Sequence, residues 1–332
     1  MEKKKIPLIS RLFPEEFFGL IMLTALIIIS IIFNKHIYYN RITGRHYFHF
    51  FSYTVLIFII FGGKFKSITK IIRNFFPLVL ITTVFENLGD VVTKINPHFA
   101  DKTLIAIDKF IFGGDPSIWM QRFYTPWLSN LMHSAYTSYY FLPPMLGMIL
   151  YISGKYKEFR DFVVAVTFTA FIGYIGYVLV PAVGPRYTLA HLYTKDIKTG
   201  AVITKVIKMI NNYEPFRADC FPSLHTAHTF IVMIFSARYL SKFISIPVNI
   251  LGTLLIISTM YGRYHYGIDV IAGLLLATFN IYIAPYVNNW WYKKIFIGNW
   301  KEHYPGKLKF DLKKIYKFFT NTKSYLKKKS NL

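Results

Sequence analysis

The chain has 332 residues, of which 54% are hydrophobic and 19% are aromatic, and its formal net charge is +23. Several apolar runs approach or exceed the roughly 20 helical residues that a bilayer core requires. Backbone polar groups cannot stay unpaired in lipid, so this composition argues against a soluble globular protein. It predicts an all-α fold, a polytopic membrane helical bundle.

The positive charge is concentrated at the C-terminal end, where residues 288–332 hold twelve lysines against Glu302 and Asp311. A basic tail after a span is typical of a cytoplasmic segment that touches anionic lipid. We therefore expect the bilayer, and no nucleic acid, as a partner. Cys220 is the only cysteine, so no intramolecular disulfide can form.

Eight candidate spans follow one another along the chain, at 17–33, 47–61, 72–91, 131–152, 161–181, 222–241, 246–262 and 265–287. We interpret residues 1–70 as an N-terminal tail with two accessory spans. Residues 71–287 then form a six-span core, and residues 288–332 a basic cytoplasmic tail.

The lysines and arginines between the spans predict the orientation. A cytoplasmic N-terminus puts most of the short basic loops inside, as the positive-inside rule requires, although loop 34–46 fits badly. We expect an integral, multi-pass protein of a bacterial inner membrane with both termini cytoplasmic. The basic residues of the inside loops are Lys64, Lys66, Lys70, Arg73, Lys155, Lys157, Arg160, Arg238 and Lys242.

Two longer segments, 93–130 and 182–220, fall outside on this interpretation. In the first, Asp115 is placed to cap a helix that has Pro116 in its first turn. The aromatic residues that follow predict a helix lying along the headgroup layer. The second segment is either a lid over the site or a plain connection.

Two short blocks carry the chemistry, Phe221–Ala227 with His225, and Arg263–Asp269 with His265. The histidines are forty positions apart, and two crossings of the bilayer return His265 to the face of His225. Asp269 follows His265 by four residues, one helical turn along the same face. The pattern predicts a site at the outer end of the bundle.

These residue types suit phosphoryl transfer, which needs a nucleophile, a proton donor for the leaving oxygen and positive charge around the phosphoryl group. We expect His265 to be the nucleophile, Asp269 to orient its ring and His225 to protonate the leaving alkoxide. Phosphate-binding candidates are Arg186, Arg263 and Ser223. Candidates for headgroup binding are Glu86, Asp90 and Tyr187.

Two other functions compete. His225 and His228, with His265 and Asp269, could instead form the zinc site of a membrane hydrolase, although the arginines would repel a cation. A non-catalytic transporter or scaffold is the third possibility, but few other charges lie within the spans. We expect no metal and no other cofactor.

The motifs resemble the type 2 phosphatidic acid phosphatase superfamily, whose blocks are Lys-x6-Arg-Pro, Pro-Ser-Gly-His and Ser-Arg-x5-His-x3-Asp. Pro222–His225 resembles the second block, and His265 with Asp269 the third, while Gly184–Tyr187 stands in place of the first. The resemblance assigns His265, Asp269 and His225 the same roles as the chemistry does.

The chain departs from those blocks in several ways: Leu224 replaces the glycine, Thr259 the third-block arginine and Leu179 the first-block lysine. These differences resemble the inositol phosphorylceramide synthase-like branch, which moves phosphorylated headgroups between lipids. We therefore expect a lipid phosphatase or phosphotransferase that acts on a lipid phosphate or phospholipid through a phosphohistidine. The choice between hydrolysis and transfer, and the oligomeric state, stay open.

Overall fold

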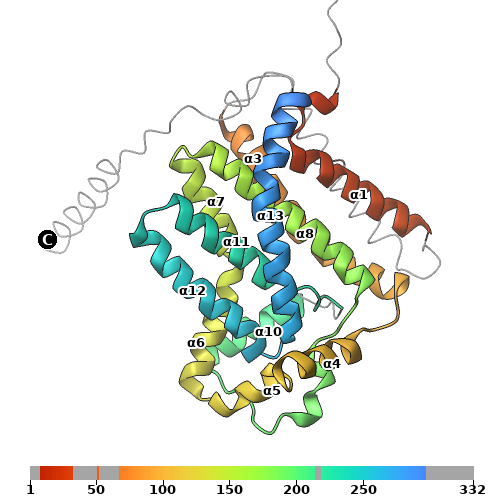
Figure 1. Cartoon of the computed structure of the whole chain (residues 1–332), viewed down its shortest axis with the longest axis vertical. Coiled ribbons are helices and arrows are strands. Elements are labelled where there is room, and N and C mark those ends of the chain that lie inside the picture. Colours follow the sequence, from red (N-terminus) through yellow and green to blue (C-terminus); the bar gives the residue numbers. More distant parts are fainter. Residues whose placement is uncertain (1–7, 33–50, 52–66, 214–217, 297–332) are drawn as a thin grey trace, which may run out of the picture.

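The computed structural model describes residues 8–32, 51, 67–213 and 218–296. Among these residues every regular element is a helix, and the long helices pack side by side as a bundle (Figure 1). This confirms the predicted all-α membrane bundle. The predicted span at 47–61 lies outside the described residues, apart from Phe51.

Six predicted spans correspond to single long helices. The first is α1 (Pro14–Ile32), and 72–91 lies within α3 (Ser67–Ile95). The last three are α11 (Leu224–Tyr239), α12 (Lys242–Tyr261) and α13 (Gly267–Lys294). A sixth, at 161–181, corresponds to α8 (Tyr156–Leu179). By length and composition α8, α12 and α13 are long and apolar enough to cross a membrane.

The predicted span at 131–152 is not one helix. It divides into α6 (Pro126–Thr137), a 3-10 turn η4 (Ser138–Tyr140) and α7 (Leu142–Ile152). The cause is the pair Pro143 and Pro144, because a proline ring has no N–H and clashes with the carbonyl four residues earlier. Both prolines lie in the first turn of α7, where the missing N–H breaks no helical hydrogen bond.

The end of the bundle that carries the start of α13 is crossed by short helices, α4 (Asp101–Phe112) and α5 (Pro116–Met120), drawn in gold in Figure 1. Asp115 caps α5 as predicted, because its carboxylate accepts a hydrogen bond from Ser117 N at 2.8 Å. Two further helices belong to the segment 182–220, α9 (Pro185–Thr188) and α10 (Ala201–Tyr213).

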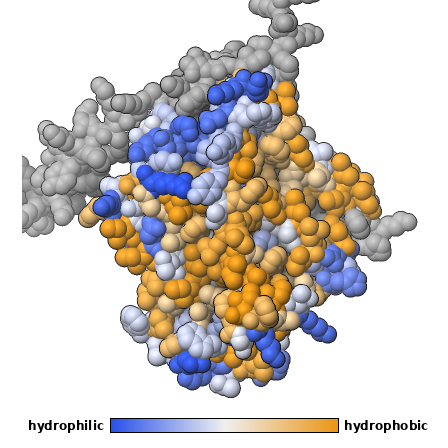
Figure 2. Space-filling view, viewed as in Figure 1, coloured by the Kyte–Doolittle hydropathy of each residue, from blue (hydrophilic) through white to orange (hydrophobic). Residues whose placement is uncertain are grey.

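The visible face has an apolar middle and hydrophilic ends (Figure 2). This is the distribution that a bilayer-spanning bundle requires. Inside the bundle, α13 packs against α8 and α11, and α11 packs against α12. Gly273 allows the close approach of α13 to α11, because a Cβ there would lie 3.2 Å from Thr226 Cβ. Gly273 therefore has a packing role between these two helices.

Buried ion pairs hold α1 in the bundle. Glu16 accepts hydrogen bonds from Arg73 of α3, with Nε and Oε1 2.5 Å apart, and Glu15 pairs with Arg160 of α8. Phe13 lies between the two guanidinium groups, 4.4 Å and 3.8 Å from its ring centroid. Both arginines are only 1% exposed. The buried glutamates thus neutralise both arginines inside the protein. Arg73 and Arg160 therefore no longer count among the loop charges from which the orientation was predicted.

Candidate active site

The two histidines meet at the end of the bundle where α11 and α13 begin. Ser223 is the N-cap of α11, and His225 lies in the first turn of that helix. Helix α12 then carries the chain back to His265, which precedes α13 by two residues. The centroids of the two imidazole rings are 5.7 Å apart. The structure therefore places together the two residues that the span count predicted to share one face.

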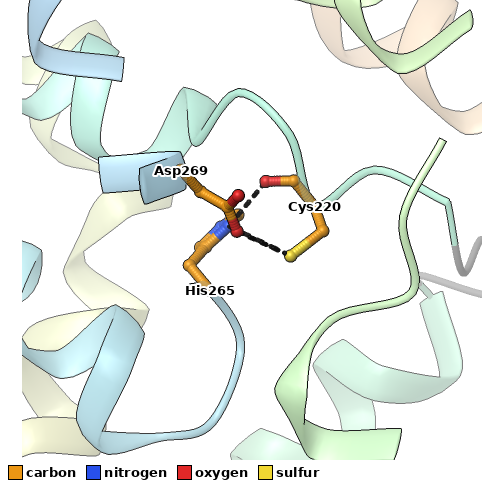
Figure 3. Close-up of side chains that lie close together, drawn as sticks. All are labelled: Cys220, His265 and Asp269. Atoms are coloured by element: carbon orange, nitrogen blue, oxygen red, sulfur yellow. Dashed lines mark hydrogen bonds and ion pairs between the residues drawn. The ribbon is translucent and has the colours of Figure 1, made fainter. Parts of the chain in front are cut away.

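The nearest hydrogen-bond partner of the His265 ring is a backbone carbonyl, whereas we expected the Asp269 carboxylate. Its Nδ1 lies 2.8 Å from the backbone carbonyl oxygen of Cys220 and 3.5 Å from Asp269 Oδ2 (Figure 3). The carbonyl is thus the hydrogen-bond partner of the ring, and Asp269 is within ion-pair distance. Because a carbonyl can only accept, it selects the tautomer with a proton on Nδ1 and leaves the Nε2 lone pair free.

Asp269 is fixed by two donors other than the imidazole. Its Oδ2 accepts hydrogen bonds from Tyr266 N at 2.8 Å and from the Cys220 thiol, with Sγ 2.8 Å away. Burial, followed by the neighbouring Asp269 carboxylate, raises the pKa of the Cys220 thiol well above its usual range. The thiol is therefore protonated and able to donate.

His225 lies in an aromatic setting. Its ring stacks on Tyr136 at 4.8 Å and packs against Tyr139 at 4.2 Å between centroids. His225 Nε2 is buried and has no hydrogen-bond partner among the described residues. A ring nitrogen in this condition is available for a proton transfer to a bound ligand. The neighbouring His228 is used differently, because its Nδ1 is hydrogen-bonded to the Tyr139 hydroxyl at 2.9 Å.

The two arginines have different surroundings. The guanidinium of Arg186 lies 5.5 Å from the ring centroid of Tyr264, which in turn stacks on Tyr136. Arg263 has a positive φ of 65°. Its guanidinium donates to the Tyr124 hydroxyl and to a backbone carbonyl, and it lies 3.8 Å from the ring centroid of Tyr193. Among the described residues it makes no hydrogen bond to either histidine.

The remaining predicted residues are placed as follows. Ser223 is fully buried, and its hydroxyl accepts a hydrogen bond from Thr226 N as the cap of α11. Tyr187 is about half exposed, in the short helix α9. Glu86 and Asp90 belong to α3, but their side chains lie outside the described part of the structure.

The zinc set proposed from sequence is not assembled. Within the described ranges, the group of possible ligands that converges is Cys220, His265 and Asp269, whose ligand atoms lie within 4.8 Å of one another. His225 and His228 do not belong to it. The three converging groups are already joined by a thiol–carboxylate hydrogen bond and by the close carbonyl on the ring.

Comparison with known proteins decides the family. A sequence profile of the PAP2 superfamily matches residues 102–283, which is more than half of the chain and includes both histidine blocks. The chain belongs to the PAP2 superfamily.

A PA-phosphatase related-family protein of Dictyostelium discoideum is 27% identical to this PAP2 chain over 145 residues. The alignment includes 43% of this chain and 26% of that protein, so the chain spans about a quarter of the length of the curated relative it matches. No solved structure matches the chain significantly.

Two acids of α4 organise the PAP2 blocks, and the sequence did not single them out. Asp101 accepts hydrogen bonds from Val183 N, Gly184 N and the Tyr266 hydroxyl, at 3.1, 2.9 and 2.8 Å. Asp108 accepts from the first two backbone N–H groups of α13, both at 2.7 Å. Burial raises the pKa of Asp108 to about 6, despite these two donors. Their seven-residue spacing, two turns on one helix face, was the available signal.

A largely apolar cavity of about 370 Å³ has His225 in its wall. Its walls come from α3, α7, α8 and α11, with Leu78, Phe85, Pro143 and Val166 among the apolar residues. His225, His228 and Asp219 line it as well. His225 of the PAP2 site thus faces a space with a mostly apolar lining.

Proposed function

We propose that this protein cleaves a lipid phosphoester through a phosphohistidine on His265, with His225 as the leaving-group acid. The observation that carries the proposal is the position of the two histidine rings, which lie 5.7 Å apart with His225 lining an apolar cavity of about 370 Å³. A lipid phosphate has the matching shape, because its charged phosphoryl group adjoins a long apolar chain. Membership of the PAP2 superfamily supports the same substrate class.

In the first step the Nε2 lone pair of His265 attacks phosphorus, and the bond from phosphorus to the lipid oxygen breaks. The leaving alkoxide takes a proton from Nε2 of His225, the atom that has no partner among the described residues. Nδ1 of His265 keeps its proton, which it donates in a hydrogen bond to the Cys220 carbonyl. The nearby Asp269 carboxylate stabilises the positive charge that develops on the ring.

In the second step an oxygen nucleophile attacks the phosphohistidine, and the bond from phosphorus to Nε2 breaks. His225, now without its extra proton, acts as the base and accepts the proton of the attacking O–H. Water as nucleophile releases inorganic phosphate or a phosphorylated headgroup, whereas a lipid hydroxyl produces a new phospholipid. Leu224 lines the cavity beside His225, so the surroundings of the acid are more apolar than a glycine would leave them. This favours transfer, in the manner of the inositol phosphorylceramide synthase-like branch.

The phosphoryl oxygens are bound chiefly by Arg186 and by the N-terminus of α11, where backbone N–H groups and the helix dipole favour an anion. Ser223 contributes as the cap that starts this helix. Arg263 reaches the phosphate only after leaving its bond to the backbone of the 182–220 segment. Tyr187, Glu86 and Asp90 are the candidates for headgroup contacts. We place the site at the outer face and both termini in the cytoplasm.

The test is incubation of the purified full-length chain with phosphatidic acid and with phospholipids, each with and without ceramide or diacylglycerol. Free phosphate identifies a phosphatase, and a new headgroup lipid identifies a transferase. We expect acid-labile labelled phosphate on His265 and its loss in His265→Ala. His191→Ala, which alters an exposed histidine of the η5 turn, is the matched control and should keep full activity. Label on His225 instead would refute the assigned roles.

A cysteine at position 187 in a Cys220→Ser background tests the orientation. In intact cells it should react with a membrane-impermeant thiol reagent. Reaction only after lysis would place the site on the cytoplasmic face and leave the chemistry untouched.

A further inference from the structure

Cys220 joins the three segments that build the site, although it lies outside every block that the sequence singled out. Its backbone N–H donates to the Ala182 carbonyl at 3.2 Å, and its own carbonyl accepts from His265 Nδ1 at 2.8 Å. The thiol donates to Asp269 Oδ2 at 2.8 Å (Figure 3). One residue therefore contacts both members of the His265–Asp269 pair through different atoms.

The two contacts have different consequences. The carbonyl fixes which imidazole nitrogen carries the proton, whereas the thiol occupies the carboxylate oxygen that lies nearest to the ring. With the thiol and Tyr266 N both bonded to Oδ2, Asp269 is held 3.5 Å from Nδ1. At that separation it acts on the ring through its charge rather than through a short hydrogen bond.

The fold leaves room for this arrangement. Gly184 has a φ of 90°, and a Cβ at that position would lie 3.1 Å from Cys220 Sγ and 2.8 Å from the Tyr264 carbonyl oxygen. A glycine next to the thiol thus allows the first block to close over Cys220. Cys220 as a whole is buried, with 3% of its surface exposed.

We propose that Cys220 is a positioning residue, whose thiol holds Asp269 at the distance from the ring that the phosphoryl transfer by His265 requires. The role rests on the proposed function, because it acts only through His265. It does not require oxidation, metal binding or contact with substrate.

The experiment compares Cys220→Ser with Cys220→Ala in the full-length protein, with release of phosphate from dioleoyl phosphatidic acid as the assay. Serine keeps a donor toward Asp269, whereas alanine has nearly the same size and no donor. We expect the serine variant to keep kcat within about threefold of wild type and the alanine variant to lose about tenfold in kcat, with KM unchanged. Ser236→Ala, which removes a buried hydroxyl near the far end of α11, is the matched control and should keep full kcat.

A double-mutant cycle with Asp269→Asn separates positioning from general structural damage. Since the thiol acts through Asp269, adding Cys220→Ala to Asp269→Asn should cost at most about threefold more. Multiplicative losses, failure of serine to restore kcat, or an alanine variant as active as wild type would each overturn the positioning role. If the wild-type protein turned over none of the lipids in the panel above, the proposed function itself would fail, and the role of Cys220 with it.

Discussion

Replacing Asp269 with asparagine tests how charge and hydrogen bonding around His265 are divided. In a serine protease, where the aspartate alone selects the tautomer, the corresponding change costs about 10⁴-fold in rate. Here the Cys220 carbonyl, 2.8 Å from Nδ1, selects the tautomer, so that part of the cost should be absent. What asparagine removes is one negative charge 3.5 Å from the ring.

The size of the remaining effect follows from Coulomb's law. If the transition state places about half a positive charge on the imidazole, and the effective dielectric constant is about 20, a carboxylate 3.5 Å away stabilises it by about 2.4 kcal/mol. This corresponds to roughly a 50-fold loss in the rate of phosphoenzyme formation. The asparagine oxygen can still accept from Tyr266 N, so the start of α13 should stay intact.

Rapid-quench measurement of labelled phosphoenzyme in the first turnover is the appropriate assay, with His265→Ala as the zero reference. A loss of about 10⁴-fold would show that Asp269, and not the carbonyl, sets the tautomer. A loss below about threefold would show that the carboxylate does not act on the ring, because its charge would then be screened.

Three further predictions concern the cavity, the ion pairs and α4. Thr82→Trp, at the cavity wall, should lower kcat/KM at least about tenfold for dioleoyl phosphatidic acid and leave hydrolysis of p-nitrophenyl phosphate unchanged; equal losses would refute the chain-binding role. Arg160→Met leaves the buried Glu15 without its cation and should cost about 3–5 kcal/mol of unfolding free energy. Lys157→Met, which breaks the ion pair between a half-exposed lysine and Asp161, should cost less than about 1 kcal/mol of unfolding free energy. Thermal unfolding measures both variants. For Asp108, the raised folded pKa of about 6 means that its stabilising contribution is present below pH 4 and lost as pH rises to about 6. Its replacement by asparagine should therefore flatten the fall in melting temperature between pH 4 and 7, and a parallel pair of curves would contradict the assignment.

The features that could be predicted from sequence depend on local pattern and on the thickness of a bilayer. The run of apolar residues between His225 and His265 contains two crossings, and this alone brings the histidines to one end. The cap at Asp115 follows from a carboxylate directly before a proline. The break at Pro143 was equally visible in sequence, but the apolar run across it concealed the change of helix.

The features that could not be predicted depend on backbone atoms and on distant partners. A carbonyl group is present at every residue, so nothing in the letter for Cys220 marks it as the partner of His265. The hydrogen bonds of Asp108 reach Gly267 and Ile268, about 160 positions away, and no periodic pattern connects them. The same holds for Glu15 and Arg160, which are recognisable as a pair only when α1 lies against α8.

The two histidine blocks are thus positioned by side chains that the proposed mechanism does not use as nucleophile, acid or phosphate ligand. Asp108 holds the first N–H groups of α13, Asp101 holds the first block and Tyr266, and Cys220 holds the His265–Asp269 pair. Because α4 supplies both acids, a shift of this one short helix would move the first block and the start of α13 together. The histidine rings would separate as a consequence, since His265 is only two residues from Gly267. If His265 and His225 have the proposed roles, the reaction therefore depends on the docking of α4 as well as on these two residues.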